Sequence, residues 1–180
     1  MFGTVVNNKQ LMELNKNGFI KIVPFQKKML QTIHYPLNIK LVSKFEDDGN
    51  IRVYELKRNR PYILDPNEYV VVEIDEHIEL AEGIIGEFVP SSNLIEKGLS
   101  LTCGKIDPEY GGNGETVRFG MKNLLNREVA IEHDLKIAYV RFFDLRALDN
   151  LPYILTKEEK LLWIQRIRRA MDDGISYEDE

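Results

Sequence analysis

The sequence contains a single cysteine, Cys103, among its 180 residues. One cysteine excludes an intrachain disulfide framework and any zinc site built from several cysteines. No aliphatic run is longer than three residues, which excludes a transmembrane helix. The N-terminal residues MFGTVVNNKQ have no basic segment followed by an apolar one, so no secretory signal is expected. We therefore expect a protein that folds in a reducing, cytoplasmic compartment.

The sequence also has no excess of basic residues, because its formal net charge is −5. The last nine residues, DDGISYEDE, hold five acids and no base, so residues 1–171 are neutral overall. A protein that binds duplex nucleic acid normally presents a basic surface. A duplex-binding function is therefore not expected, whereas a small nucleotide ligand remains compatible with this charge.

Short β-prone segments follow one another along most of the chain, at spacings of about ten residues with turn residues between them. This pattern predicts an all-β sandwich, jelly roll or barrel. The cluster Asp47-Asp48-Gly49-Asn50 separates two alternating segments and predicts a hairpin. The predicted strands are residues 19–23, 37–42, 51–56, 69–74, 84–89, 99–106, 116–121, 128–132 and 136–143.

The longer helix signals lie near the two ends of the chain. Residues 8–16 predict a short helix that ends at Asn17-Gly18. Near the other end, Thr156 and Glu159 form a capping box for a helix over residues 157–173. We therefore divide the chain into a β-domain, residues 1–150, and a helix with an acidic tail, residues 151–180.

The C-terminal helix has one apolar face, which packs either on its own β-domain or on a partner subunit or larger assembly. The residues of this candidate docking face are Trp163, Ile164, Ile167 and Met171.

Familiar catalytic motifs are missing. His77-Ile78-Glu79 has the H-x-E form of zinc deaminases, but the cysteine pair that this chemistry needs is absent. The chain has neither a nucleophile elbow nor phosphate-loop spacing. The chemistry must therefore be sought elsewhere.

Two segments are candidates for a site. In the first, Ser91 and Ser92 follow a strand and open a helical turn, which suits either a phosphate or plain N-capping. In the second, Asp107 follows a strand, and Tyr110 comes three residues later. Asp107 could orient a water or a sugar hydroxyl and Tyr110 could pack on a sugar, or the segment is a β-turn.

Taken together, these segments resemble the dCTP deaminase/dUTPase superfamily. The likeness extends over residues 19–145. It is carried, in chain order, by IKIVPF, NIKL, LDPNEYVV, EHIEL, PSSNLIEKGL, GKIDPEYGG, Asn123 and KIAYVRF. The resemblance implies a distorted jelly-roll fold, a homotrimer, and active sites between subunits that bind a deoxynucleoside triphosphate with Mg²⁺. It also implies that a glutamate activates water in the deaminases, and that the aspartate at Asp107 orients the attacking water in the dUTPases.

The chain departs from the superfamily pattern at several functional positions. Pro90 stands where the family has an arginine before the two serines, and proline has neither charge nor N–H. Gly120 stands where counting back from Asn123 places the deaminase glutamate, and Glu115 is a poor substitute. In the stretch that follows the serines only Lys97 can contact a phosphate. The first-motif aspartate is replaced by Asn38, or by Pro36 if the alignment shifts. The glycine-rich C-terminal arm of dUTPases is also missing.

Three functions remain open. We favour a non-catalytic or impaired trimer that serves as a structural or assembly module, for example a virion or decoration protein of a virus, located in the host cytoplasm or the virion. The alternative is an active dUTP or dCTP hydrolase or deaminase that uses Mg²⁺, with Asp107 and Glu115 as catalytic candidates. A nucleotide sensor is the third, with Ser91, Ser92, Lys97 and Tyr110 as ligand contacts.

Overall fold

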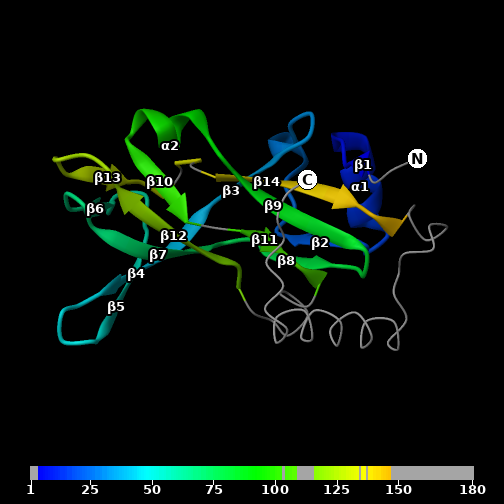
Figure 1. The fold of residues 1–180 in the computed structure, drawn as a ribbon. Coiled ribbons are helices and arrows are strands. Elements are labelled where there is room, and N and C mark those ends of the chain that lie inside the picture. Colours follow the sequence, from blue (N-terminus) through cyan, green and yellow to red (C-terminus); the bar gives the residue numbers. More distant parts are fainter. Residues whose placement is uncertain (1–3, 103, 109–115, 134, 137, 147–180) are drawn as a thin grey trace, which may run out of the picture.

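The computed structural model describes residues 4–102, 104–108, 116–133, 135–136 and 138–146. Within these ranges most elements are antiparallel strands, which confirms the all-β prediction (Figure 1). The predicted helix at residues 157–173, with Trp163, Ile164, Ile167 and Met171, lies outside the described residues. The strands are β1 (Thr4–Val5), β2 (Ile20–Val23), β3 (Tyr35–Leu37), β4 (Ile39–Phe45), β5 (Ile51–Glu55), β6 (Tyr62–Leu64), β7 (Tyr69–Ile74), β8 (His77–Leu80), β9 (Ile84–Pro90), β10 (Leu99–Thr102), β11 (Lys105–Ile106), β12 (Arg118–Asn123), β13 (Val129–Ile131) and β14 (Ala138–Asp144).

Two larger sheets form the body of the fold. One has the strand order β1-β14-β9-β11, with β3 also paired to β14, and the other has the order β10-β12-β7-β4-β5. Their apolar faces pack on each other, as Phe88 of β9 and Phe119 of β12 show with ring centroids 5.2 Å apart. Two smaller pairs, β13-β6 and β2-β8, complete the strands. Alternating burial along β7, β9 and β14 is the pattern of strands with one face in a shared core.

The N-terminal helix α1 (Asn8–Lys16) forms over the residues that the sequence predicts. Asn7 caps it, accepting hydrogen bonds from the N–H groups of Lys9 and Gln10, while the Gln10 side chain accepts from the N–H of Asn7. The helix ends at Asn17, and Gly18 takes a φ of +76°, which favours glycine. The other helices are α2 (Ser92–Glu96) and a 3₁₀ turn (Lys27–Met29). None of the described helices is long and apolar enough to cross a membrane.

Several strand predictions need correction. The strand expected at residues 37–42 is interrupted at Asn38, because Asn38 bonds to Glu76, and it becomes β3 and β4. The strand expected at residues 99–106 is also two strands, because the chain crosses from the sheet of β10 to the sheet of β11. Strands β1, β6 and β8 were not predicted as strands, since two to four residues carry little periodicity. The hairpin of β4 and β5 is confirmed, with Phe45 opposite Ile51.

Glu76 is a buried carboxylate in the turn between β7 and β8, and it bonds to Asn38 between β3 and β4. Its side chain accepts hydrogen bonds from the backbone N–H of Asn38, at 3.0 Å, and from the Asn38 amide. Burial raises the pKa of the Glu76 carboxyl above 4.5, and the bonds from Asn38 only partly offset this effect. The native state therefore holds a proton on Glu76 more tightly than the unfolded chain does.

This raised pKa predicts a pH-dependent stability. The contribution of Glu76 is fully present below pH 4.5 and is lost as the pH rises through the folded-state pKa. Glu76→Gln should remove this part of the pH dependence. Denaturant titrations of both proteins across this window test it, and a difference in unfolding free energy that does not change with pH would contradict the account.

Asn123, at the end of β12, forms hydrogen bonds to the β6–β7 turn and to the loop after β12. It is fully buried, and its side-chain N–H groups donate to the carbonyls of Leu64 at 3.2 Å, Asp65 at 3.0 Å and Arg127 at 2.8 Å. Its side-chain oxygen accepts from the N–H of Leu125 at 2.9 Å. One side chain thus satisfies backbone groups of the β6–β7 turn and of the loop after β12.

We expect Asn123→Ala to lower the free energy of unfolding by about 2–4 kcal/mol, because buried backbone groups lose their partners. Asn93→Ala is the matched control, since the exposed Asn93 amide makes only a 3.5 Å bond to the Lys136 carbonyl. Its cost should stay below about 0.5 kcal/mol. Denaturant unfolding measures both, and equal costs would contradict the role assigned to Asn123.

Candidate functional site

A pocket of about 300 Å³ lies where β10, β11 and β12 meet. Two cations line it, each paired with a carboxylate. Lys105 Nζ lies 2.9 Å from Asp107 Oδ1, and Arg118 Nε lies 3.0 Å from Glu73 Oε2. The other lining residues are Val71, Phe88, Thr102, Gly104, Ile106, Val117, Phe119 and Gly120. Apolar walls with cations at the rim suit a ligand that combines a flat ring with anionic groups.

Asp107 lies at the edge of this pocket. It follows β11, which pairs with the Gly86–Glu87 portion of β9. Its side chain is 43% exposed, so a ligand or a water molecule can reach the carboxylate. The structure therefore places this catalytic candidate in an accessible position next to the pocket.

Gly120 forms part of the pocket wall, and the space above it is filled. Gly120 lies between Thr102 on β10 and Val71 on β7, and Tyr69 is two residues further along β7. A Cβ atom on Gly120 would come within 3.0 Å of both Thr102 Oγ1 and Tyr69 Oη. These two hydroxyl oxygens lie 3.3 Å apart and are hydrogen-bonded. The Tyr69–Thr102 pair thus occupies the place where a glutamate side chain would begin.

The serine segment has the capping role that the sequence left open. Ser91 is 1% exposed and is the N-cap of α2. Its hydroxyl donates to the Lys136 carbonyl at 2.7 Å and accepts from the N–H of Leu94 at 3.2 Å. Ser92 is exposed at the start of α2, and Lys97 Nζ donates to the Ala130 carbonyl at 3.4 Å. A phosphate role for these residues stays a prediction, for which Ser92 and Lys97 are the more accessible.

The two candidate segments lie at different points along β9. Asp107 follows the residue paired with Gly86, whereas Ser91 follows Pro90 at the other end of the same strand. Asp107 is level with Ile85, and the six-residue separation between Ile85 and Ser91 spans about 20 Å at the rise of an extended strand. One subunit therefore does not bring Asp107 and Ser91 together. The candidates Tyr110 and Glu115 lie outside the described residues.

The described residues contain no group of three or more histidine, cysteine, aspartate or glutamate side chains that could hold a metal ion. The carboxylates of Asp107 and Glu73 lie beside the pocket, and each is paired with a lining cation, Lys105 or Arg118. A dedicated protein cage for Mg²⁺ is therefore not found in this part of the chain.

A sequence model of the dCTP deaminase-like family matches residues 5–145. The chain belongs to this family. The superfamily resemblance drawn from the motifs is thereby confirmed. The match covers almost all of the described residues, including both candidate segments.

Known members of the family are distant relatives of this chain. A dCTP deaminase of Pyrococcus abyssi is 24% identical over 134 residues, which are 74% of this chain and 82% of that protein. A dUMP-forming dCTP deaminase of Corynebacterium kroppenstedtii is 23% identical over 166 residues, covering 83% of this chain and 86% of that protein. Among solved structures, the 2′-deoxycytidine 5′-triphosphate deaminase of Agrobacterium tumefaciens superposes with a TM-score of 0.63 at 10% identity. That match covers 80% of this chain and 47% of the other, so this chain spans about half of its length, and it supports the fold.

Sequence reasoning did not identify Tyr69 and Thr102 as site residues. They are far apart in the chain and become neighbours only through the register of β7, β12 and β10. The available signal was Gly120 itself, because a glycine inside a strand often marks a close approach by another group. The sequence could not show which side chains make that approach.

Gly120→Ala should lower the free energy of unfolding by about 1–3 kcal/mol, because its Cβ would overlap the two hydroxyl groups. In a Tyr69→Ala/Thr102→Ala background the same substitution should cost much less. Gly104→Ala is the control in the same pocket, since, its chain neighbours aside, no atom of the described residues lies within 4 Å of a Cβ there. Denaturant unfolding of this set measures the coupling, and an equal cost in both backgrounds would contradict the proposed filling of the space.

Proposed function

We propose that this chain acts on a pyrimidine deoxynucleoside triphosphate, and that it retains hydrolysis of the triphosphate but not deamination of the base. The observation that carries the proposal is a contrast around one pocket. Asp107, beside the lining residues Lys105 and Ile106, is accessible, whereas the hydroxyl groups of Tyr69 and Thr102 lie over Gly120. The relatives support the substrate class, because they are named dCTP deaminases and several are dUMP-forming. The latter name implies loss of pyrophosphate as well as ammonia.

Hydrolysis requires a water molecule that attacks the α-phosphate. In the proposed step the Asp107 carboxylate accepts a proton from this water, and the water oxygen forms a bond to the α-phosphorus. The bond between the α-phosphorus and the oxygen that bridges the α- and β-phosphates breaks. The products are a deoxynucleoside monophosphate and pyrophosphate. Lys105 and Arg118 lie at the pocket rim, where their charge favours a triphosphate. Mg²⁺ bound to the phosphates would offset negative charge, and no protein ligand is assigned to it.

Deamination requires a group that activates water beside the pyrimidine ring. The resemblance assigns this task to a glutamate at the position of Gly120, where the hydroxyl groups of Tyr69 and Thr102 occupy the place of a Cβ atom. Loss of such a group typically costs several orders of magnitude in rate. In the serine segment, Pro90 stands where the family has an arginine, so one phosphate-binding cation is missing. This difference favours a second candidate function, in which a nucleotide binds without turnover.

The sequence alone favoured a non-catalytic assembly module, and the relatives weaken that interpretation because they are enzymes. A trimer fits the proposed enzyme as well. Asp107 and the Ser92–Lys97 segment are separated along β9 within one subunit, so both can contribute to one site only if two copies meet. A role in a virion stays a prediction of the sequence.

The test is pyrophosphate release from dUTP and dCTP in the presence of Mg²⁺. We expect turnover by the wild type and a fall of about 100-fold or more in kcat for Asp107→Asn. Asp47→Asn is the control, because Asp47 is exposed in the β4–β5 turn. Calorimetric binding of both nucleotides is measured in parallel. Binding without turnover would favour the sensor, and no binding at millimolar concentration would leave the assembly module.

A further inference from the structure

Among the described residues, strand β5 pairs only with β4 and so forms an edge of its sheet. The hydrogen bonds from Leu56 N–H to the Lys40 carbonyl and from Glu46 N–H to the Asn50 carbonyl set the phase of the ladder. Because bonded pairs alternate in an antiparallel ladder, Arg52 and Tyr54 bond to β4. The backbone groups of the other three residues, Ile51, Val53 and Glu55, therefore point away from the sheet.

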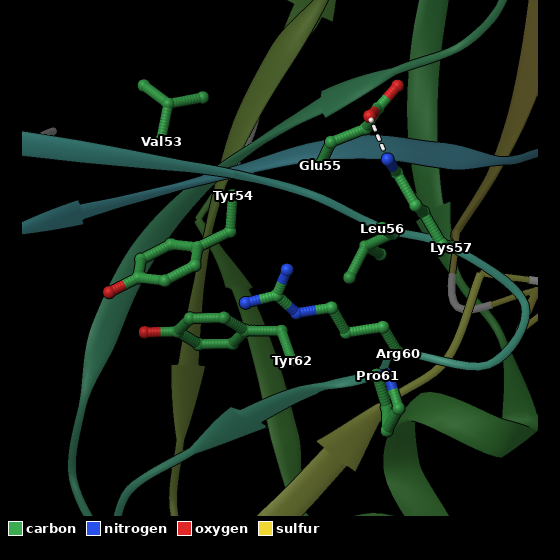
Figure 2. A pocket seen from close by; sticks show the side chains of 8 residues that line it. All are labelled: Val53, Tyr54, Glu55, Leu56, Lys57, Arg60, Pro61 and Tyr62. Carbon is green, nitrogen blue, oxygen red and sulfur yellow. Dashed lines mark ion pairs between the residues drawn. The ribbon is translucent and has the colours of Figure 1, made fainter.

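A pocket of about 290 Å³ lies beside this edge (Figure 2). Lys57 and Arg60 are joined by backbone hydrogen bonds across a tight turn. At this turn the chain that leads from β5 to β6 is therefore paired as in a hairpin. Strand β6 instead pairs with β13, and the two strands diverge. The pocket occupies the resulting gap, between residues 53–57 of one strand and residues 60–62 of the other. An edge strand beside an open groove can accept an extended peptide as an added strand.

The groove combines an apolar floor with a guanidinium group. Tyr54 and Tyr62 have ring centroids 5.0 Å apart, and Leu56 is 4% exposed beneath them. Figure 2 shows the Arg60 side chain projecting toward the two tyrosine rings. Lys57 is paired with Glu55 at 3.1 Å, whereas no acidic partner of Arg60 is found among the described residues. Arg60 is thus the cation in the groove that can bind an incoming carboxylate.

The remaining surroundings favour an acidic peptide with alternating apolar residues. Lys57, Arg58 and Arg60 put three cations within four residues of this turn. On the strand itself, Ile51 is 58% and Val53 is 56% exposed, and both lie on the same face. An added strand that carries apolar side chains at every second residue would cover them.

We propose that this groove binds an acidic peptide as an added strand on β5, and that residues 172–180 of a second copy supply it. This segment, DDGISYEDE, has five acids and no base, and Ile175 and Tyr177 alternate with Ser176. In an extended conformation Ile175 and Tyr177 lie beside Ile51 and Val53, and the acids that follow reach Arg60.

A second copy is chosen because of where the described chain ends. Strand β14 ends beside α1 and β1, at the opposite end of the molecule from the β4–β5 hairpin (Figure 1). The proposal does not depend on the enzymatic function proposed above, because the groove and the catalytic pocket share no residue.

Amide hydrogen exchange of the full-length protein tests the added strand. The outward amides of Ile51, Val53 and Glu55 should exchange about tenfold or more slower in the wild type than in a variant whose five C-terminal acids are changed to Asn or Gln. Arg60→Gln should speed their exchange in the same direction. Arg127→Gln, at an exposed arginine in another loop, should leave it unchanged. The amides of Arg52 and Tyr54, which bond to β4, report that the sheet is intact in each variant.

Equal exchange of the three outward amides in the wild type and the acid-free variant would overturn the proposal. A second experiment identifies the source of the segment. In Arg60→Lys, carbodiimide treatment should join the new amine to a carboxylate of residues 172–180. Mixing isotope-labelled and unlabelled copies should give cross-links between the two. Cross-links only within one copy would overturn the assignment to a second copy, and cross-links only elsewhere would overturn the docking site.

Discussion

The register of β12 between β10 and β7 is the constraint on which the candidate site depends. This register sets Gly120 opposite Thr102 on one side and Val71 on the other. A shift by one residue would turn the side chains of β12 to the opposite faces of the sheet. Asn123, at the end of the same strand, binds three carbonyl groups and thereby resists such a shift. Strand β12 thus contributes both to the stability of the fold, through Asn123, and to the wall of the pocket, through Gly120.

The Tyr69–Thr102 pair lies at the position where the resemblance places the deaminase glutamate. A glycine at this position could be an isolated loss that a single substitution would reverse. The structure instead shows two hydroxyl side chains hydrogen-bonded over it. A carboxylate side chain at this position would therefore have to displace the hydroxyl groups of two side chains on the neighbouring strands.

The sequence predicted much of the fold because its strands alternate and its turns carry clear signals. Helix α1 and the β4–β5 hairpin formed as expected, since caps and turns are local features. The break at Asn38 was not predicted, because it depends on a carboxylate from a distant turn. The same limit applies to the site. Asp107 could be proposed as a candidate from a local motif in the sequence. Tyr69 and Thr102, in contrast, become neighbours only through strand pairing.

The positions of the two candidate segments along β9 bear on how many subunits form one site. Asp107, after β11, and the Ser92–Lys97 segment, after β9, are separated along β9. In the proposed function both can contribute to one nucleotide site only where two copies meet. The free edge of β5 is distinct from both segments, and it offers a further surface for contact between copies.

In the proposed function the protein retains hydrolysis of the triphosphate and has lost deamination of the base. The most direct measurement follows ammonia and pyrophosphate together, from one sample of the protein with dCTP and Mg²⁺. The account predicts that pyrophosphate and dCMP accumulate without ammonia. Release of ammonia at the rate of pyrophosphate or faster would contradict it, because water would then be activated at the base without a carboxylate at position 120.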